Sequence, residues 1–281
     1  NQAVGSIIKR YETAKAHRSS WEQHWKECYE YALPQREVFN EHSPGKKKNT
    51  RIYDSTALIA TQRFASRLQS VLVPPFKKWA KLSAGSAVPK NQQTKIDTQL
   101  ESTTDTLFSY INNSNLATEA NEAFLDLAVG TGALLLEEGE GEELLRFKAV
   151  PLKQLIVEDG PSGTVENVFR DHSVAARDIE RIWPKGKASE AVQKLLTENP
   201  DKQIHIVEAT IWDDKEKQYS FVVIESATKH VVFEDYFEQS PWIVFRWSKV
   251  SGERYGRGPI MTALPDIKTA NEVVKFVLKN A

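Results

Sequence analysis

The spacing of apolar residues changes at Gly130–Gly132, and this change constrains the fold more than any other feature of the chain. Before this point, apolar residues recur three and four positions apart, which is the spacing of one face of an α-helix. After it, short apolar runs alternate with Gly and Pro, a pattern typical of strands joined by turns. The sequence therefore predicts an α+β fold whose first part is mainly helical.

The first predicted helix carries one stripe of mostly apolar residues. It ends at Pro34, because proline lacks an amide proton and its ring clashes with the preceding turn. Such a stripe predicts a long helix with one buried face. Its members are Ile7, Tyr11, Ala14, Arg18, Trp21, Trp25, Cys28 and Ala32.

Three further helices and one short strand are predicted before the change of pattern. The second helix is expected to be capped by Asp54 or Ser55, whose side chains can accept a hydrogen bond from a free amide of the first turn. That helix is expected to end at Val73–Pro74–Pro75. The strand is predicted over Trp79–Ser83, and the third and fourth helices over Gln92–Ile111 and Thr118–Val129.

The second part of the chain predicts strands, two short helices and a terminal helix. Ser173 is expected to cap a helix that ends near Trp183, and a second helix spans Ala188–Thr197. The last segment, Pro259–Ala281, is predicted to be helical. Predicted strands cover Leu144–Val150, Gln154–Glu158, Val165–Arg170, Ile204–Trp212, Tyr219–Ile224, His230–Phe237 and Trp242–Trp247, with hairpin turns at Asp213–Lys215 and Ser226–Thr228.

Charge and cysteine content narrow the classes of function. Formal net charge is -1, from 37 basic and 38 acidic residues, whereas a protein that grips nucleic acid tightly usually has a basic excess. Cys28 is the single cysteine, which suits a reducing cytoplasm. No apolar run is long enough to span a bilayer, and no signal peptide is expected. The chain lacks an initiating Met and its last segment has no helix stop, so we expect a longer natural protein.

Two patterns resemble ligand sites but have simpler interpretations. Gly130–Thr131–Gly132 could cradle a phosphate, yet it follows a helix and fits neither phosphate-loop pattern, so a helix C-cap turn is favoured. His17, His24 and Cys28 lie on one helix with ligand-type spacing for a metal. No second pair of ligands is nearby, so packing and surface roles are favoured and no metal or cofactor is predicted.

Two charged runs also resemble binding sites and have simpler interpretations. The acidic run Glu137–Glu143 could bind a cation or hold a like-charge pair, but its two glycines between apolar strands favour a solvated hairpin tip. Lys46, Lys47 and Lys48 with Arg51 could contact nucleic acid, but a solvated Pro/Gly loop is the favoured interpretation. No phosphate loop or catalytic cluster of side chains stands out, so we expect no enzyme.

Four stretches in the right order resemble the portal, or head-to-tail connector, proteins of short-tailed, podovirus-type phages. They are the DSTA and VPPFKKW segments, the DLAVGTGA turn, the VENVFR strand, and the RW segment followed by GERYGRGP and ALPDIKT. The resemblance runs from about Tyr53 to the end. Its structural positions are Asp54, Pro74, Pro75, Trp79, Gly130, Gly132, Trp247, Gly252, Tyr255, Gly256, Arg257, Gly258, Pro259, Pro265 and Asp266.

The resemblance implies a virion component assembled in the host cytoplasm. Such subunits form a ring, of twelve when full length, at one capsid vertex, where double-stranded DNA passes and terminase, capsid or scaffold and tail adaptor proteins dock; no membrane is involved. It implies a wing over residues 1–200, a β-rich wing or clip region over 201–258, and the start of a stem helix over 259–281. Lys268, Lys275 and Lys279 are its candidate DNA-facing charges, beside the alternatives of a solvated face or an intersubunit salt bridge. A head-tail adaptor is the alternative function.

Overall fold

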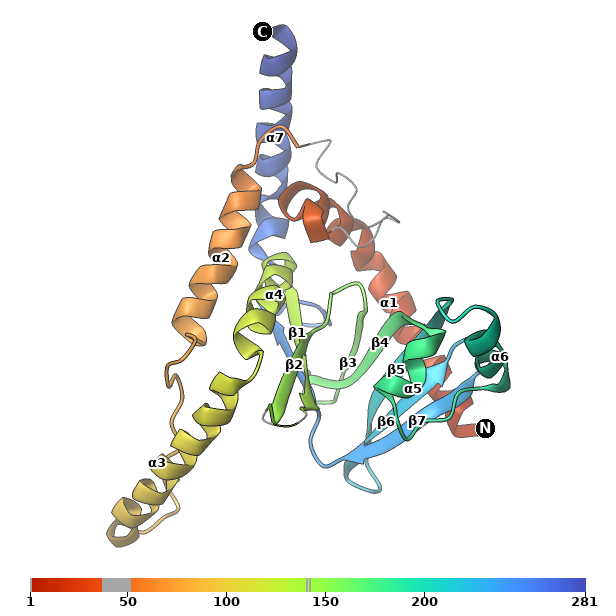
Figure 1. The fold of residues 1–281 in the computed structure, drawn as a ribbon. Coiled ribbons are helices and arrows are strands. Elements are labelled where there is room, and N and C mark those ends of the chain that lie inside the picture. The colour runs from red at the N-terminus through yellow and green to blue at the C-terminus, as the bar shows by residue number, and fades with distance from the viewer. Residues whose placement is uncertain (1, 37–51, 140, 142) are drawn as a thin grey trace.

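The structure is a computed structural model that describes residues 2–36, 52–139, 141 and 143–281. Within these ranges the chain forms helices and two antiparallel sheets, so the predicted α+β class is confirmed (Figure 1). The helices are α1 (Gln2–Ala32), α2 (Thr56–Leu72), α3 (Lys90–Asn113), α4 (Leu116–Val129), α5 (Ile179–Ile182), α6 (Glu190–Glu198) and α7 (Pro259–Asn280). The strands are β1 (Thr131–Glu138), β2 (Leu145–Ala149), β3 (Leu155–Asp159), β4 (Val165–Ala175), β5 (Gln203–Asp213), β6 (Gln218–Glu225), β7 (His230–Phe237) and β8 (Trp242–Arg246).

Helix α1 connects two separate hydrophobic cores through its predicted stripe. Near its start, Tyr11 and Ala14 pack against buried side chains of the five-stranded sheet. Near its end, Trp25, Cys28 and Ala32 pack into the larger core formed with α4, β1 and α7. The stripe of apolar residues was therefore a correct prediction of the buried face.

The five-stranded sheet is antiparallel and has the order β3-β4-β5-β6-β7, in which each strand pairs with the next one along the chain. The hairpin turns predicted after β5 and after β6 are confirmed, because Asp213 pairs with Gln218 and Glu225 pairs with His230. Strands β4 and β5 lie on either side of α5 and α6 in the sequence and pair over most of their length. This sheet therefore includes strands from both sides of residue 200.

The three-stranded sheet has the order β2-β1-β8 and joins distant parts of the sequence. Strand β1 follows α4 directly and forms a hairpin with β2. The strand predicted over Trp242–Trp247 exists as β8, and it pairs with β1, with Leu135 opposite Trp242, and not with β7. Although β8 follows the five-stranded sheet in sequence, it completes the three-stranded sheet that begins after α4.

The strand predicted over Trp79–Ser83 is wrong. This segment has no strand partner in the described part of the chain and lies along α3 instead. Side chains of α3 take up its backbone donors: the amide of Leu82 donates to Thr104 Oγ1 at 3.1 Å and that of Ala84 to Asp97 Oδ1 at 2.7 Å. The apolar residues of this segment suggested a strand, but the described part of the chain offers no neighbouring strand to pair with it.

The helix predicted to begin at Ser173 is also wrong. Ser173 lies within β4 and pairs with His205 of β5. Pairing with β5 extends β4 to Ala175, and the turn that leads into α5 begins only at Ala176. The side chain of Ser173 is exposed and caps no helix, because the partner strand fixes the backbone in the extended conformation.

Two helices project from the sheets in opposite directions. In Figure 1, α7 runs upward to the C-terminus and α3 runs downward with the preceding loop beside it. The outer half of α7 exposes apolar side chains, among them Phe276 at 69%. Among the described residues, no helix has both the length and the apolar character needed to cross a membrane.

A polar network attaches α1 to the five-stranded sheet. Asp171 on β4 accepts hydrogen bonds from Tyr11 Oη at 2.6 Å and Lys15 Nζ at 2.7 Å, and it pairs with His205 of β5. Burial alone would raise the pKa of Asp171, but the hydrogen bonds from His205, Lys15 and Tyr11 hold it well below the usual range. Burial and the bond to Asp171 in turn raise the pKa of Tyr11 to about 12.

We expect Asp171→Asn to lower the free energy of unfolding by about 1–3 kcal/mol at pH 7, because three donors lose their charged acceptor. The pKa of Asp171 is lower in the folded than in the unfolded state, so its stabilisation is present above about pH 4 and is lost as the pH falls through the folded value. Urea denaturation at pH 7 and at about pH 3.5 should show the difference from wild type shrinking in acid. Asp235→Asn, on the exposed part of β7, is the control and should change stability little.

Candidate functional site

The segment between β8 and α7 crosses the turn between α4 and β1, and it contains the GERYGRGP motif. Three hydrogen bonds fix the crossing: Trp247 N donates to Gly130 O at 3.0 Å, Gly258 N to Val129 O at 3.0 Å, and Gly256 N to Thr131 Oγ1 at 2.9 Å. Two regions that are far apart in sequence are therefore joined through their backbones, directly before the first turn of α7.

Close approach explains why glycine occupies these positions. A Cβ built on Gly130 would lie 2.0 Å from Gly256 O, and one built on Gly256 would lie 2.3 Å from Gly130 O. A Cβ on Gly258 would lie 2.2 Å from Ala128 O. No side chain fits between these backbones.

The Gly130–Thr131–Gly132 turn is the helix C-cap that the sequence favoured. Gly130 N donates to Asp126 O at the end of α4, and Gly132 already lies in β1 opposite Phe245. A Cβ on Gly132 would lie 2.5 Å from the Phe245 ring. The turn thus packs protein against protein on both sides, whereas a phosphate cradle would present open amides.

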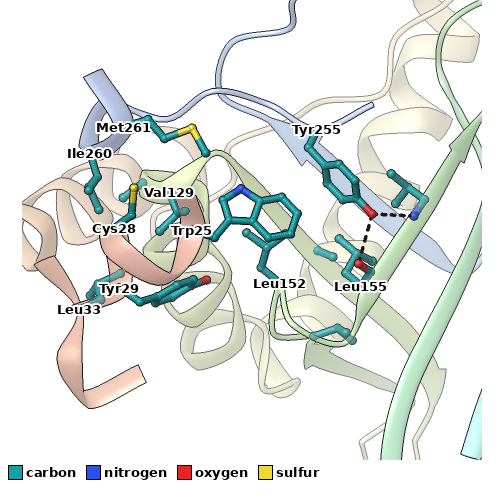
Figure 2. Close-up of a cluster of buried hydrophobic side chains, with 14 of the residues drawn as sticks. Trp25, Cys28, Tyr29, Leu33, Val129, Leu152, Leu155, Tyr255, Ile260 and Met261 are labelled. Atoms are coloured by element: carbon teal, nitrogen blue, oxygen red, sulfur yellow. Dashed lines mark hydrogen bonds between the residues drawn. The ribbon is translucent and has the colours of Figure 1, made fainter. Parts of the chain in front are cut away.

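Tyr255 anchors the crossing segment in the larger core, as Figure 2 shows. Its side chain is buried, and its ring lies edge-on to Trp25 with the centroids 4.9 Å apart. The hydroxyl donates to Leu155 O at 3.4 Å and accepts from Val157 N at 3.3 Å. Burial raises the pKa of Tyr255 to about 12, so the hydroxyl stays neutral.

Arg257 and Gly252 lie at the exposed side of the same segment. Both oxygens of Glu253 accept hydrogen bonds from Arg257, at 2.8 and 2.6 Å, and the guanidinium lies 5.1 Å from the centre of the Trp21 ring. Gly252 has φ of +82° in an open turn, a conformation that favours glycine. Trp247, at 47% exposed, packs edge-on against Phe64 of α2.

Asn271, in the middle of α7, links that helix to the motif segment before α2. Its Oδ1 accepts from the amides of Tyr53 and Asp54 at 2.7 and 3.2 Å. Asp54 Oδ1 in turn accepts from Thr56 N, so the Asp54 side chain is the capping acceptor, while Ser55 makes no side-chain cap bond. The choice between the two predicted capping residues therefore falls on Asp54.

The remaining motif residues are more exposed. Pro259 begins α7, where a missing amide costs nothing, while Pro265 and Asp266 lie on the exposed side of that helix. After α2, Pro74 and Pro75 form the bend toward α3, and Trp79, 41% exposed, lies edge-on to Phe108.

The three lysines of α7 lie at different points along the helix. Lys268 forms an ion pair with Glu27 of α1 and lies 5.7 Å from the Tyr31 ring, and its hydrogen bond to Glu27 raises its pKa. Lys275 pairs with Glu272 at 2.8 Å. Lys279 is exposed near the end of the helix. Two of the three charges are therefore partly engaged within the chain, and their orientation toward DNA stays a prediction.

The other candidate sites do not assemble into a metal or catalytic centre. Cys28 is fully buried among apolar side chains, with a pKa raised to about 12 by burial, and the described residues contain no group of three metal ligands. Glu137 and Glu138 end β1 and the acidic run forms the predicted hairpin tip, of which positions 140 and 142 lie outside the described residues. Lys46–Lys48 and Arg51 also lie outside them.

One buried polar cluster was missed by sequence analysis. Asp126, on the inner face of α4, accepts from Tyr29 Oη at 2.6 Å and from Arg36 Nη1 at 3.2 Å. Burial raises the pKa of Asp126. The available signal was an acidic residue inside the otherwise apolar run from Phe124 to Val129.

We expect Gly256→Ala to lower the free energy of unfolding by at least about 2 kcal/mol, because the new methyl group would overlap Gly130 O and force the backbones apart. Gly85→Ala is the matched control, since a Cβ there meets no atom within 4 Å. The urea midpoints of both variants and wild type measure the effect. Equal midpoints for Gly256→Ala and Gly85→Ala would contradict the close crossing.

Comparisons with known proteins agree with the motif resemblance. The family model described as bacteriophage head to tail connecting protein matches residues 4–281. A probable portal protein of Bordetella phage BPP-1 is 23% identical over 278 residues, which cover 93% of this chain and 50% of that protein. The portal protein of Salmonella phage epsilon15 is 23% identical with the same coverage, and that of Escherichia phage T7 is 22% identical over 96% of this chain and 51% of its own length.

The chain thus spans about half the length of the curated relatives that it matches. The family match covers both sheets, the glycine crossing and α7. Together with the four ordered motifs, it shows that the chain belongs to the family of bacteriophage head to tail connecting proteins.

Proposed function

We propose that this chain is part of a portal subunit, a structural protein that forms a ring at one capsid vertex and through which double-stranded DNA passes during packaging and ejection. The observation that carries the proposal is the family match over residues 4–281, with portal proteins among the relatives. In the full-length ring, terminase would dock during packaging and tail proteins afterwards.

The net charge of the chain supports a protein through which DNA slides more than one that binds DNA tightly. Each lysine or arginine that neutralises a phosphate adds affinity, and strong affinity would oppose sliding of the duplex. A formal net charge of -1 over 281 residues is compatible with sparse contacts.

We further propose the wing, clip and stem division of the chain. Residues 1–200 would form most of the wing, 201–258 a β-rich wing or clip region, and 259–281 the start of the stem. The projection of α7 away from both sheets supports the last assignment (Figure 1). Since β4 and β5 pair across residue 200, the wing and the β-rich region would share one sheet.

A ring requires two different complementary faces on each subunit, because a cyclic interface beyond a dimer is heterologous. The exposed apolar residues of outer α7, Val273, Phe276, Val277 and Leu278, are one candidate for such a face. Two exposed tryptophans, Trp79 and Trp247, are further candidates, whereas Trp25 and Trp242 are buried.

The first test is the particle mass in solution, by light scattering coupled to size exclusion, for this chain and for the longer subunit expected to contain it. A mass near twelve subunits for the longer protein, with an axial hole in negative-stain images, is the expected result. A longer protein that stays monomeric at every concentration and salt would contradict the proposal and favour a head-tail adaptor.

A second test concerns the proposed DNA-facing charges. Lys268→Glu, Lys275→Glu and Lys279→Glu, combined in a full-length ring, should reduce DNA packaged per particle if these side chains face the duplex. Lys215→Glu, Lys217→Glu and Lys229→Glu, in hairpin turns of the five-stranded sheet, form the control. Intact packaging by the first triple variant would exclude these lysines as channel residues.

A further inference from the structure

A polar cavity of about 360 Å³ lies between α1 and the segment that precedes α7. From α1 it is lined by His17, Ser20 and His24, and from the crossing segment by Glu253, Arg254 and Arg257. It opens beside the Trp21 and Tyr255 rings, so its floor is the aromatic core that holds the crossing segment.

Arg254, which lines this cavity, has an unsatisfied donor. Its Nη1 is buried, and no acceptor in the described part of the chain bonds to it. Arg18, which packs near the same Tyr255 ring, shows the contrast: its guanidinium bonds to Glu22 Oε1, Lys153 O and Leu155 O. A buried donor without an acceptor is unfavourable, and more so when the group is charged. Arg254 therefore lacks the acceptor that the fold supplies to Arg18.

The charges around the cavity favour an anion. Both oxygens of Glu253 are held by Arg257, whose hydrogen bonds lower the pKa of that carboxyl and keep it ionised. The nearby carboxylates of α1, Glu22 and Glu27, are paired with Arg18 and Lys268. The Arg254 charge is thus left without a counter-ion among the described residues.

Among the other side chains that line the cavity, the two histidines are available hydrogen-bond donors, whereas Ser20 is already bonded. The Ser20 hydroxyl donates to His17 O at 3.1 Å and so is already committed. The imidazoles of His17 and His24 lie one above the other on α1, seven positions apart, on the side that faces the cavity. Both imidazoles line the cavity that Arg254 lines, so potential donors come from two elements of the chain.

We propose that this cavity binds a phosphate group, with the Arg254 guanidinium as its main ligand. Donors from several directions suit a tetrahedral oxyanion, and arginine suits phosphate because its fork presents paired donors. The volume exceeds that of one phosphate ion and leaves room for a group that carries it. The source is either free phosphate or the phosphodiester backbone of nucleic acid.

Titration calorimetry of the 281-residue chain with inorganic phosphate, against sodium chloride at equal ionic strength, tests the site. We expect saturable binding of one phosphate per chain. Arg254→Gln should raise the Kd at least about tenfold, since it removes a charge-assisted bond. Arg181→Gln, at an exposed position of α5, is the matched control and should bind as wild type does.

Two further measurements keep the test decisive if Arg254→Gln alters the fold. Circular dichroism melting reports the fold of each variant, and His24→Gln, which leaves Arg254 in place, should also weaken phosphate binding. Absence of saturable binding by wild type, or an unchanged Kd in both variants, would overturn the proposal. Binding of a glutamate-rich peptide that depends on Arg254, without binding of phosphate, would overturn it in favour of a carboxylate partner.

A competition arm identifies the source of the phosphate. A short DNA duplex that displaces inorganic phosphate from wild type would assign the site to a nucleic-acid backbone. A duplex that fails to displace bound phosphate would assign it to a free anion. Both results support a phosphate site, and neither depends on whether the longer subunit forms a ring.

Discussion

The fold depends on the contact between two backbones at Gly130 and Gly256. This contact sets where β8 ends and where α7 begins, because Trp247, directly after β8, and Gly258, directly before α7, bond to Gly130 and Val129. It also places β8 next to β1 and so completes the three-stranded sheet. A single methyl group at the crossing would separate α4, β1, β8 and α7, which otherwise meet at one point.

Helix α1 is the second element on which the arrangement depends. It contacts the five-stranded sheet near its start and the larger core near its end, while Arg18 between these regions bonds to backbone carbonyls of the β3 segment. Ion pairs from Arg10 to Glu158 and from Lys15 to Asp171 lie along the same helix. Helix α1 therefore supports the relative position of the two sheets, beside the direct contacts between them, in which Trp242 Nε1 donates to Thr210 Oγ1 at 2.9 Å and Arg246 pairs with Asp159.

Local patterns in the sequence predicted the elements well, but they could not predict their partners. Helical spacing identified α1 to α4 and α7, because one buried face imposes a period on the residues themselves. The assignment of β8 to β1 required knowledge of a contact between distant segments, and Trp79–Ser83 looked like a strand although no strand adjoins it. The motif residues Gly256 and Gly258 were identified by resemblance alone, since the close approach that requires glycine appears only when α4 is in place. The cavity around Arg254 combines α1 with a loop far along the chain, and no spacing within either segment predicts it.

The segment that contains the five-stranded sheet begins and ends beside the same strand, β1. Val150 N bonds to Ala133 O on one side of β1, and Leu136 N bonds to Pro241 O on the other. The segment of residues 151–240 thus leaves and returns on opposite sides of β1, about 10 Å apart across the sheet and three residues, again about 10 Å, apart along the strand. Units with adjacent ends can be lengthened, shortened or exchanged during evolution without disturbing the scaffold that carries them. The chain is built as a scaffold of α4, β1, β8 and α7 with an inserted sheet, and α1 is the part that must adapt whenever that insert changes size.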